Sequence, residues 1–196
     1  INSIEDPIEL PLHGINQTQI TEKAGITFAT ILRALLRQDP DVIMIGEIRD
    51  QQTAEIAIKA AQTGHLVLST LHTNSTQATL ARLANLGIAK DLIDSCVKLI
   101  ISQRLVRCLC SNCKYPSPEQ KNFIINNQQI ILPNWQATGC QFCYSGYKGR
   151  TAIYDCFELA KQSLPSPYAL FNSGIELIKK GITSLDEVYQ VVGDIE

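Results

Sequence analysis

Two pairs of cysteines are the strongest chemical signal in the sequence. Cys110 pairs with Cys113, and Cys140 pairs with Cys143, each at C-x-x-C spacing. This spacing offers two thiolates on a tight turn, and four thiolates complete the tetrahedral coordination of Zn²⁺. Because four protein ligands leave no open position, the predicted role of the zinc is structural. The alternative is a set of reduced thiols without metal, and Cys108, at C-x-C spacing from Cys110, is a competing ligand.

The remaining cysteines, Cys96 and Cys156, fall in apolar patterns and are predicted to lie in the core. The first nine residues have neither a positively charged start nor an apolar run, so no signal peptide is expected. In a reducing compartment, clustered cysteines hold metal or stay free more often than they form disulfides. The cysteine content therefore favours a cytoplasmic protein with a metal site.

Three polar residues are predicted to share one edge of a sheet. Glu5 ends the first predicted strand, Glu47 follows the second after Gly46, and His72 follows the third. In open α/β sheets, ligands bind beyond the carboxyl ends of the strands. Two carboxylates can serve Mg²⁺ and its water, and an imidazole can approach phosphate oxygens. Together they indicate a metal–phosphate site, although each residue alone is equally well explained as a solvated strand end.

His65 and His72 are not expected to act on the same phosphate. They are seven residues apart across a predicted strand. At the rise of an extended strand this separation is about 20 Å. His72 shares the sheet edge with Glu47, whereas His65 lies at the opposite end and is better explained as a capping or interface histidine.

The elements that would position these residues alternate between strand and helix. Continuous apolar runs are typical of parallel strands covered on both faces, and apolar residues at helical spacing indicate amphipathic helices. The pattern predicts an α/β sheet with helices on both faces. The predicted strands are 2–5, 42–45 and 66–71; the predicted helices are 27–38, one from Asp50 to Thr63, one between Ser75 and Gly87, and a long one over 90–107; residues 10–26 are predicted to be a loop.

Composition limits the classes of protein that remain. The 196 residues give room for one domain with a small appendage, and 45% hydrophobic content is enough for a core. A formal net charge of -2 and 6% aromatic residues argue against a nucleic-acid binder. We expect no membrane span, because no apolar run approaches about 18 residues.

The chain is predicted to have three parts. Residues 1–107 form the strand–helix core, residues 108–150 form a loop-rich module around the cysteine pairs with a polar insert at 122–134, and residues 151–196 are helical. Ser184 and Glu187 have the spacing of a capping box for the last helix.

Several of these segments resemble motifs of one superfamily, the secretion ATPases. Residues 3–9 (SIEDPIE) resemble its Asp box, residues 37–50 (RQDPDVIMIGEIRD) its Walker B segment, and residues 63–73 (TGHLVLSTLHT) its His box. The tetracysteine segment, with QRLVR at 103–107 and GYKGRT at 146–151, is similar to the GspE/PulE/PilB branch, the type II secretion and type IV pilus-assembly ATPases.

The resemblance implies a RecA-like P-loop NTPase core that hydrolyses ATP with Mg²⁺, and a zinc-binding appendage. It implies a homo-hexameric motor, peripheral at the cytoplasmic face of a bacterial inner membrane, that works with an inner-membrane platform protein. By motif position, Glu47 matches the glutamate that serves Mg²⁺ and water, Glu5 the acid that orients or deprotonates the attacking water, and His72 the residue near the γ-phosphate. The further nucleotide-binding positions are Asp6, Glu9 and His65.

One family motif is absent from the sequence. No G-x-x-x-x-G-K-[ST] phosphate-binding loop occurs in the 196 residues, and in the family it precedes the Asp box. The chain is therefore expected to be a C-terminal part, with a core that lacks the Walker A strand, loop and helix, and to bind ATP poorly alone. Two other functions stay open: a catalytically inactive, zinc-bearing interaction module, and a zinc-dependent nucleic-acid binder, which the charge argues against. The motifs do not separate pilus assembly, type II secretion and DNA uptake.

Overall fold

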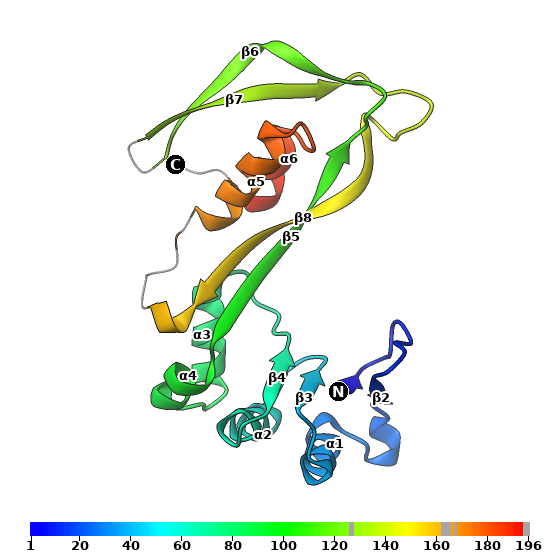
Figure 1. Cartoon of the computed structure of the whole chain (residues 1–196), viewed down its shortest axis with the longest axis vertical. Coiled ribbons are helices and arrows are strands. Elements are labelled where there is room, and N and C mark those ends of the chain that lie inside the picture. Colours follow the sequence, from blue (N-terminus) through cyan, green and yellow to red (C-terminus); the bar gives the residue numbers. More distant parts are fainter. Residues whose placement is uncertain (126–127, 162–165, 167, 194–196) are drawn as a thin grey trace. The chain divides into compact units, whose positions relative to one another are not determined.

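The computed structural model describes residues 1–125, 128–161, 166 and 168–193, without the side chains of 123–128. The chain has a mixed α/β fold and forms two compact units (Figure 1). Unit 1 comprises Ile1–Ile100 with Glu158–Gln162, and unit 2 comprises Ile101–Phe157 with Ser163–Glu196. The three-part division expected from the sequence stays a prediction.

Unit 1 is built on a parallel sheet with the strand order β2-β1-β3-β4. Ile4 lies opposite Ile45, and Ile45 lies opposite Ser69, so the carboxyl ends of three strands meet at one edge. The strands are β1 (Asn2–Glu5), β2 (Asn16–Gln19), β3 (Val42–Ile45) and β4 (Leu66–Ser69). The alignment of strand ends predicted from the sequence is therefore present.

Three of the four α-helices of unit 1 begin at residues whose side chains cap them, and α4, which follows Ala89, has no such cap. Thr27, Asp50 and Ser75 each accept a hydrogen bond from the backbone amide three residues on, which satisfies an amide that the first turn leaves unpaired. The helices are α1 (Phe28–Leu35), α2 (Gln51–Gln62), α3 (Thr76–Asn85) and α4 (Lys90–Cys96), with short 3-10 turns at Glu22–Ala24, Leu36–Gln38 and Leu159–Lys161.

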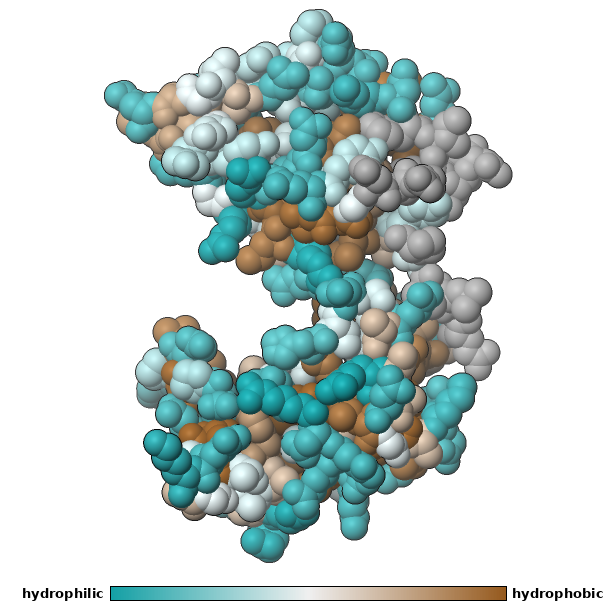
Figure 2. Space-filling model, turned by 180° about the vertical axis from the view of Figure 1, so that it is seen from behind, coloured by the Kyte–Doolittle hydropathy of each residue, from teal (hydrophilic) through white to brown (hydrophobic). Residues whose placement is uncertain are grey.

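In the described structure the sheet is packed on one face only, and the prediction of helices on both faces was wrong. Ile4, Ile43 and Ile45 are fully buried against the helices. On the opposite face, Leu66 is 57% and Leu68 is 49% exposed, because no helix of the described residues covers them. In the space-filling view, hydrophobic residues, coloured brown, also reach the surface in other places (Figure 2).

Unit 2 combines a β-hairpin with two helices. In the hairpin, β6 (Lys114–Ile125) pairs antiparallel with β7 (Gln128–Ala137), and helices α5 (Ala169–Lys179) and α6 (Leu185–Val192) pack on each other. Gly174 permits this packing, since a Cβ there would lie 2.7 Å from Val188 Cγ1.

A second pair of strands, β5 (Leu99–Leu109) and β8 (Tyr147–Glu158), forms a two-stranded sheet. The predicted helix over 90–107 was therefore wrong beyond Cys96, where the chain turns from α4 into β5. The start of the predicted helical region at 151–196 also lies in strand β8, and among the residues described there α-helices begin only at Ala169, after a 3-10 turn at Leu159–Lys161.

Smaller predictions also need correction. Strand β2 lies inside the predicted loop 10–26, and the predicted insert 122–134 contributes to the hairpin strands. Cys156 is exposed rather than in the core, and Cys96 is half-buried. Ser184 does cap α6, but the Glu187 carboxylate accepts hydrogen bonds from Arg107. Among the described residues, no helix is long and apolar enough to cross a membrane.

Candidate functional site

The carboxyl edge of the parallel sheet brings several of the predicted residues together. Glu47 follows β3, and its Oε2 lies 3.2 Å from Nε2 of His72, which follows β4. The Glu47 side chain is only 13% exposed, whereas that of His72 is 86% exposed. The pair thus presents a shielded carboxylate beside a solvent-facing imidazole.

Arg49 is the second partner of the Glu47 carboxylate. It donates a hydrogen bond to Glu47 Oε1, and its Nη1 lies 3.6 Å from Asp6 Oδ2. The hydrogen bond from Arg49 holds the pKa of Glu47 below its usual value, against the opposing effect of burial. Glu47 is therefore a carboxylate at neutral pH, and Arg49 joins the turn after β3 to the loop after β1.

One oxygen of Glu47 is left without a hydrogen bond. Oε2 is buried, and no described residue has the geometry of a full hydrogen bond to it. The nearest polar group is His72 Nε2 at 3.2 Å, which contributes to lowering the pKa of Glu47. A buried anionic oxygen without a donor is costly unless a ligand or ion satisfies it. Carboxylate oxygens are ligands that Mg²⁺ prefers, so Glu47 fits the metal that the family motifs imply.

The close approach of β1 and β3 explains why a glycine precedes Glu47. The Gly46 amide donates to Ile4 O at 2.7 Å, and a Cβ at residue 46 would lie 3.0 Å from that oxygen. Thr70 Oγ1 donates to Gly46 O at 2.6 Å, which ties the same turn to β4. A larger side chain at 46 would push Glu47 away from this edge.

Glu5 ends β1 in a hydrogen-bonded cluster of its own. Its Oε1 accepts from Ser3 Oγ at 2.6 Å and from Gln17 Nε2 at 2.8 Å. These two donors hold the pKa of Glu5 below its usual value, because they stabilise the charged form. Glu5 is thus a fixed anion at the edge that also carries Glu47.

The other predicted nucleotide-binding residues are more scattered. Asp6 and Glu9 are exposed in the loop after β1. His65 lies at the opposite end of β4 from His72, and its Nδ1 is 3.0 Å from Ala60 O and 3.1 Å from Thr63 Oγ1. These contacts place His65 at the carboxyl end of α2, in the capping position that its spacing also favoured.

The four predicted cysteine ligands lie together in unit 2. Their sulfur atoms are all within 4.8 Å of one another, and Cys108 is not part of the group. The Sγ–Sγ distances are 3.8 Å for Cys110–Cys140, 3.8 Å for Cys113–Cys143 and 3.7 Å for Cys140–Cys143. A disulfide requires about 2.05 Å, whereas a tetrahedron with Zn–S bonds of about 2.3 Å requires roughly 3.8 Å. The cluster has the spacing of a zinc site.

The thiols of this cluster differ in acidity. Burial raises the pKa of Cys113 to about 12. Burial also opposes ionisation of Cys143, but hydrogen bonds involving the Cys140 and Gly146 backbone and the neighbouring thiols lower its pKa to about 7. Thiolates are the form that binds metal, so Cys143 is the group that ionises first.

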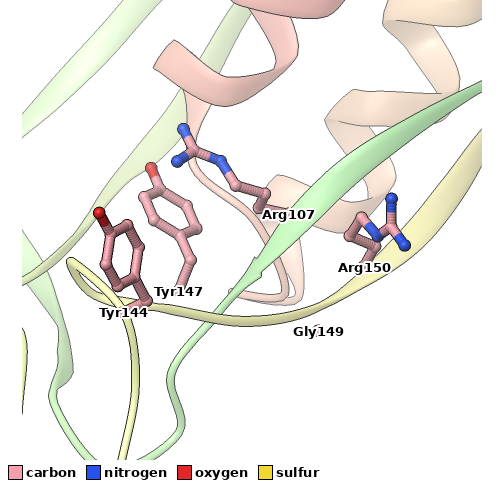
Figure 3. Close-up of a pocket in the computed structure, with 5 residues that line it drawn as sticks. All are labelled: Arg107, Tyr144, Tyr147, Gly149 and Arg150. Atoms are coloured by element: carbon pink, nitrogen blue, oxygen red, sulfur yellow. The ribbon is translucent and has the colours of Figure 1, made fainter.

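A shallow hollow of about 240 Å³ beside the cysteine module is lined by tyrosines and arginines (Figure 3). Arg107 lies 4.2 Å from the centroid of the Tyr147 ring and is bonded to Glu187. Arg150 points away from Tyr147 in the close-up. Arg107, paired with Glu187 of α6, therefore links β5 to α6 beside this hollow.

Sequence reasoning missed three residues that organise the strand-end site: Ser3, Gln17 and Arg49. Arg49 lies two residues after Glu47. A cationic side chain so close to a predicted metal-binding acid could have identified Arg49 as its partner. Gln17 lies in a wholly polar strand, NQTQ, whose composition carried no such signal.

Comparison with known proteins identifies the family of this chain. The family model for "Type II/IV secretion system protein" matches residues 1–190. The "Protein transport protein HofB homolog" of Escherichia coli K12 is 49% identical over 98% of this chain and 46% of its own length. The "Type IV pilus assembly ATPase PilB" of Acinetobacter baylyi is 44% identical, over 99% of this chain and 38% of its own length. The "Type II secretion system ATPase E" of Vibrio cholerae is 42% identical, over 97% of this chain and 42% of its own length.

A solved structure agrees with these relatives. The crystal structure of the pilus retraction motor PilT with bound ADP matches 97% of this chain and 51% of that chain, at 27% identity and a TM-score of 0.58. The chain belongs to the type II/IV secretion system protein family, in its GspE/PilB branch. It spans less than half the length of the curated relatives named above.

Proposed function

We infer that this chain is part of a motor ATPase that hydrolyses ATP to drive type IV pilus assembly or type II protein secretion. The observation that carries the proposal is the sheet edge, where the buried, donor-free oxygen of Glu47 lies beside His72. Relatives named as pilus-assembly and type II secretion ATPases support it. They do not favour the alternative, a catalytically inactive interaction module.

In this proposal the unit 1 sheet is part of a RecA-like core, and three residues act on nucleotide. Glu47 would hold Mg²⁺ or its water through the oxygen that lacks a donor. Glu5, anionic at the same edge, would orient the attacking water and accept its proton. His72 would donate a hydrogen bond to the γ-phosphate as its charge shifts in the transition state.

The other family positions have subsidiary roles. Asp6 would help to hold Arg49 beside the nucleotide site, since the two side chains are 3.6 Å apart. Glu9, in the same exposed loop, stays a predicted nucleotide contact. His65 also stays a family-based prediction, and its capping contacts at the end of α2 support a structural role instead.

For unit 2 we propose a structural zinc on Cys110, Cys113, Cys140 and Cys143. The sulfur spacing and the C-x-x-C pairs support it. When bound, zinc supplies a covalent-like anchor between two loops that are 30 residues apart. Following the family, the complete protein would be a hexamer, peripheral at the cytoplasmic face of the inner membrane, with a membrane platform protein as partner and no nucleic acid.

The test compares the full-length protein with the 196-residue chain. The full-length protein should release phosphate from Mg²⁺-ATP, whereas the chain alone should hydrolyse it at the background rate. The reason is that the chain has no G-x-x-x-x-G-K-[ST] loop to hold the phosphates. A full-length protein without turnover would refute the proposed function, and turnover by the isolated chain would require another phosphate-binding loop.

A further inference from the structure

A single side chain of strand β2, that of Gln17, contacts both Glu5 and the loop that follows Glu5. Gln17 Nε2 donates to Glu5 Oε1 at 2.8 Å and to Leu10 O at 3.1 Å. Gln17 Oε1 accepts from the Leu12 amide at 2.6 Å. The side chain is half-buried. Its bond to Glu5 is partly shielded from water, whereas its bonds to Leu10 and Leu12 are exposed.

The pattern of partners fixes which way the amide group points. Its two acceptor partners, a carboxylate and a carbonyl, require the NH₂ group, and its one donor partner, a backbone N–H, requires the oxygen. The flipped amide would put oxygen against oxygen and N–H against N–H. The amide group of Gln17 is therefore held in one orientation, and its hydrogen bond to Oε1 restrains the Glu5 carboxylate in turn.

The same contacts leave one oxygen of Glu5 available. Ser3 and Gln17 both bind Oε1, and no described residue donates a hydrogen bond to Oε2. With one oxygen held from two sides, the direction of the other is set. A carboxylate that must orient a water molecule needs this kind of restraint, because misdirected groups lose most of their catalytic benefit.

We propose that Gln17 is a positioning residue for ATP hydrolysis, which aims the free oxygen of Glu5 at the attacking water and pins the loop at residues 10–12. This inference rests on the proposed function, and it names the element that makes Glu5 effective. Gln17 is not a catalytic residue, because its effect on hydrolysis is exerted through Glu5, while its contacts with Leu10 and Leu12 hold the loop. Strand β2 thereby gains a role beyond adding an edge to the sheet.

Gln19 provides a matched control. It lies two residues further along β2, on the same face of the strand. Its side chain accepts from the Ile8 amide at 3.4 Å, an exposed and long contact. Gln19 lies opposite Glu5 in the register of β1 and β2, but the side-chain hydrogen bonds to Glu5 come from Ser3 and Gln17. Replacing Gln19 therefore separates support of the loop from the hydrogen bond to the carboxylate.

The experiment measures ATP turnover and nucleotide affinity in the full-length protein for Gln17→Leu, Gln19→Leu, Glu5→Ala and the Gln17→Leu/Glu5→Ala double variant. We expect Gln17→Leu to lower kcat about tenfold, as loss of a hydrogen bond to a charged group does. ATP affinity should stay within about twofold, because Gln17 acts on the water and not on the nucleotide. Gln19→Leu should match the wild type in kcat.

The double variant is the decisive comparison. If Gln17 acts through Glu5, Gln17→Leu should change kcat less than about twofold once Glu5 is alanine. An equal loss in both backgrounds, or a wild-type kcat for Gln17→Leu, would overturn the inference. A tenfold loss of ATP affinity in Gln17→Leu would overturn it as well, since it would show a general disturbance of the site.

Gln17→Glu keeps the experiment informative if Gln17→Leu fails to fold. Glutamate keeps the shape and still accepts from Leu12, but it turns a second carboxylate toward Glu5. We expect a larger fall in kcat than with leucine, and a wild-type kcat would again overturn the inference. If the wild-type protein itself shows no turnover, the proposed function fails, and the role of Gln17 fails with it. This outcome is read from the wild type, so it is distinguishable from the variant results that would overturn the role of Gln17 alone.

Discussion

The strand-end site of unit 1 and the cysteine cluster of unit 2 both gather residues that are far apart in sequence, but they differ in completeness. The cluster holds four sulfur atoms within 4.8 Å of one another, so the chain itself supplies all four ligands of the proposed zinc. The strand-end site holds a buried oxygen of Glu47 that no described residue satisfies. A site whose four ligands all come from the chain leaves the proposed metal no open position, whereas an open site can bind a substrate or its metal, and this difference separates the structural role proposed for the cluster from the catalytic role proposed for the strand ends.

Breaking the closed site should have the largest effect. Cys140→Ser removes one of four thiolates, and the chain should lose its zinc and the order of residues 108–150, because metal binding and folding are coupled in such modules. The sheet of unit 1 should persist, since its core contains none of these residues. Elemental analysis and limited proteolysis check this.

Cys156→Ser is the control, because Cys156 is exposed and outside the cluster. It should leave about one zinc per chain, as in the wild type. The proposed site would be contradicted if wild-type protein, purified without chelator, held far less than one zinc ion per chain.

In unit 1, Gly46→Ala tests the strand ends that hold the open site. The new Cβ would meet Ile4 O at 3.0 Å, so β1 and β3 must move apart. We expect a loss of about 2 kcal/mol in the free energy of unfolding, as for other overpacked positions. ATP turnover of the full-length protein should fall with it, because Glu47 follows directly. A variant with unchanged unfolding midpoint in urea would show that the edge is less tightly packed than the structure indicates.

The smallest effect concerns Glu187, the buried carboxylate that joins β5 to α6. Although burial opposes its charge, hydrogen bonds from Arg107 lower the pKa of Glu187 below 4.5. The stabilisation is therefore present above about pH 4.5 and is lost as the pH falls through the lowered pKa. Glu187→Gln should cost about 1.5 kcal/mol at pH 7, at the low end for charged hydrogen bonds because Arg107 is half-exposed.

Thermal unfolding at several pH values checks this prediction. The difference in midpoint between wild type and Glu187→Gln should shrink as the pH falls below about 4.5. Glu176→Gln is the control, since Glu176 pairs with Lys179 at the surface, and its effect should be much smaller. A difference that is constant with pH would rule out the ion pair as the cause.

The parts of the fold that local chemistry determines were predictable. Asp50 and Ser75 mark helix starts because their side chains bind the first-turn amides, and this signal lies within four residues of sequence. The short strand Val42–Ile45 was also predictable from local sequence, because its four residues form a continuous apolar run. Since parallel strands align their ends, the approach of Glu47 and His72 followed from the order of elements.

The parts that depend on distant partners were not predictable. Apolar residues from Leu92 to Leu105 recur at helical spacing, yet β5 begins at Leu99 because it pairs with β8, almost 50 residues later in sequence. Strand β2 is wholly polar, so neither the strand nor the contact of Gln17 with Glu5 had a hydrophobic signal. The cysteine cluster was predictable because of its two C-x-x-C pairs, and the structure shows that Cys108, the competing candidate, lies outside the cluster.

The most direct test of the account is the Glu47→Gln variant of the full-length protein. Glutamine keeps the size of the side chain but removes the charge that Mg²⁺ and its water require, and loss of such a group typically lowers the rate about 10² to 10⁴-fold. Phosphate release and binding of a fluorescent ATP analogue should be measured together. We expect hydrolysis to be lost while nucleotide binding is retained; hydrolysis at the wild-type rate, or loss of nucleotide binding, would contradict the role proposed for Glu47.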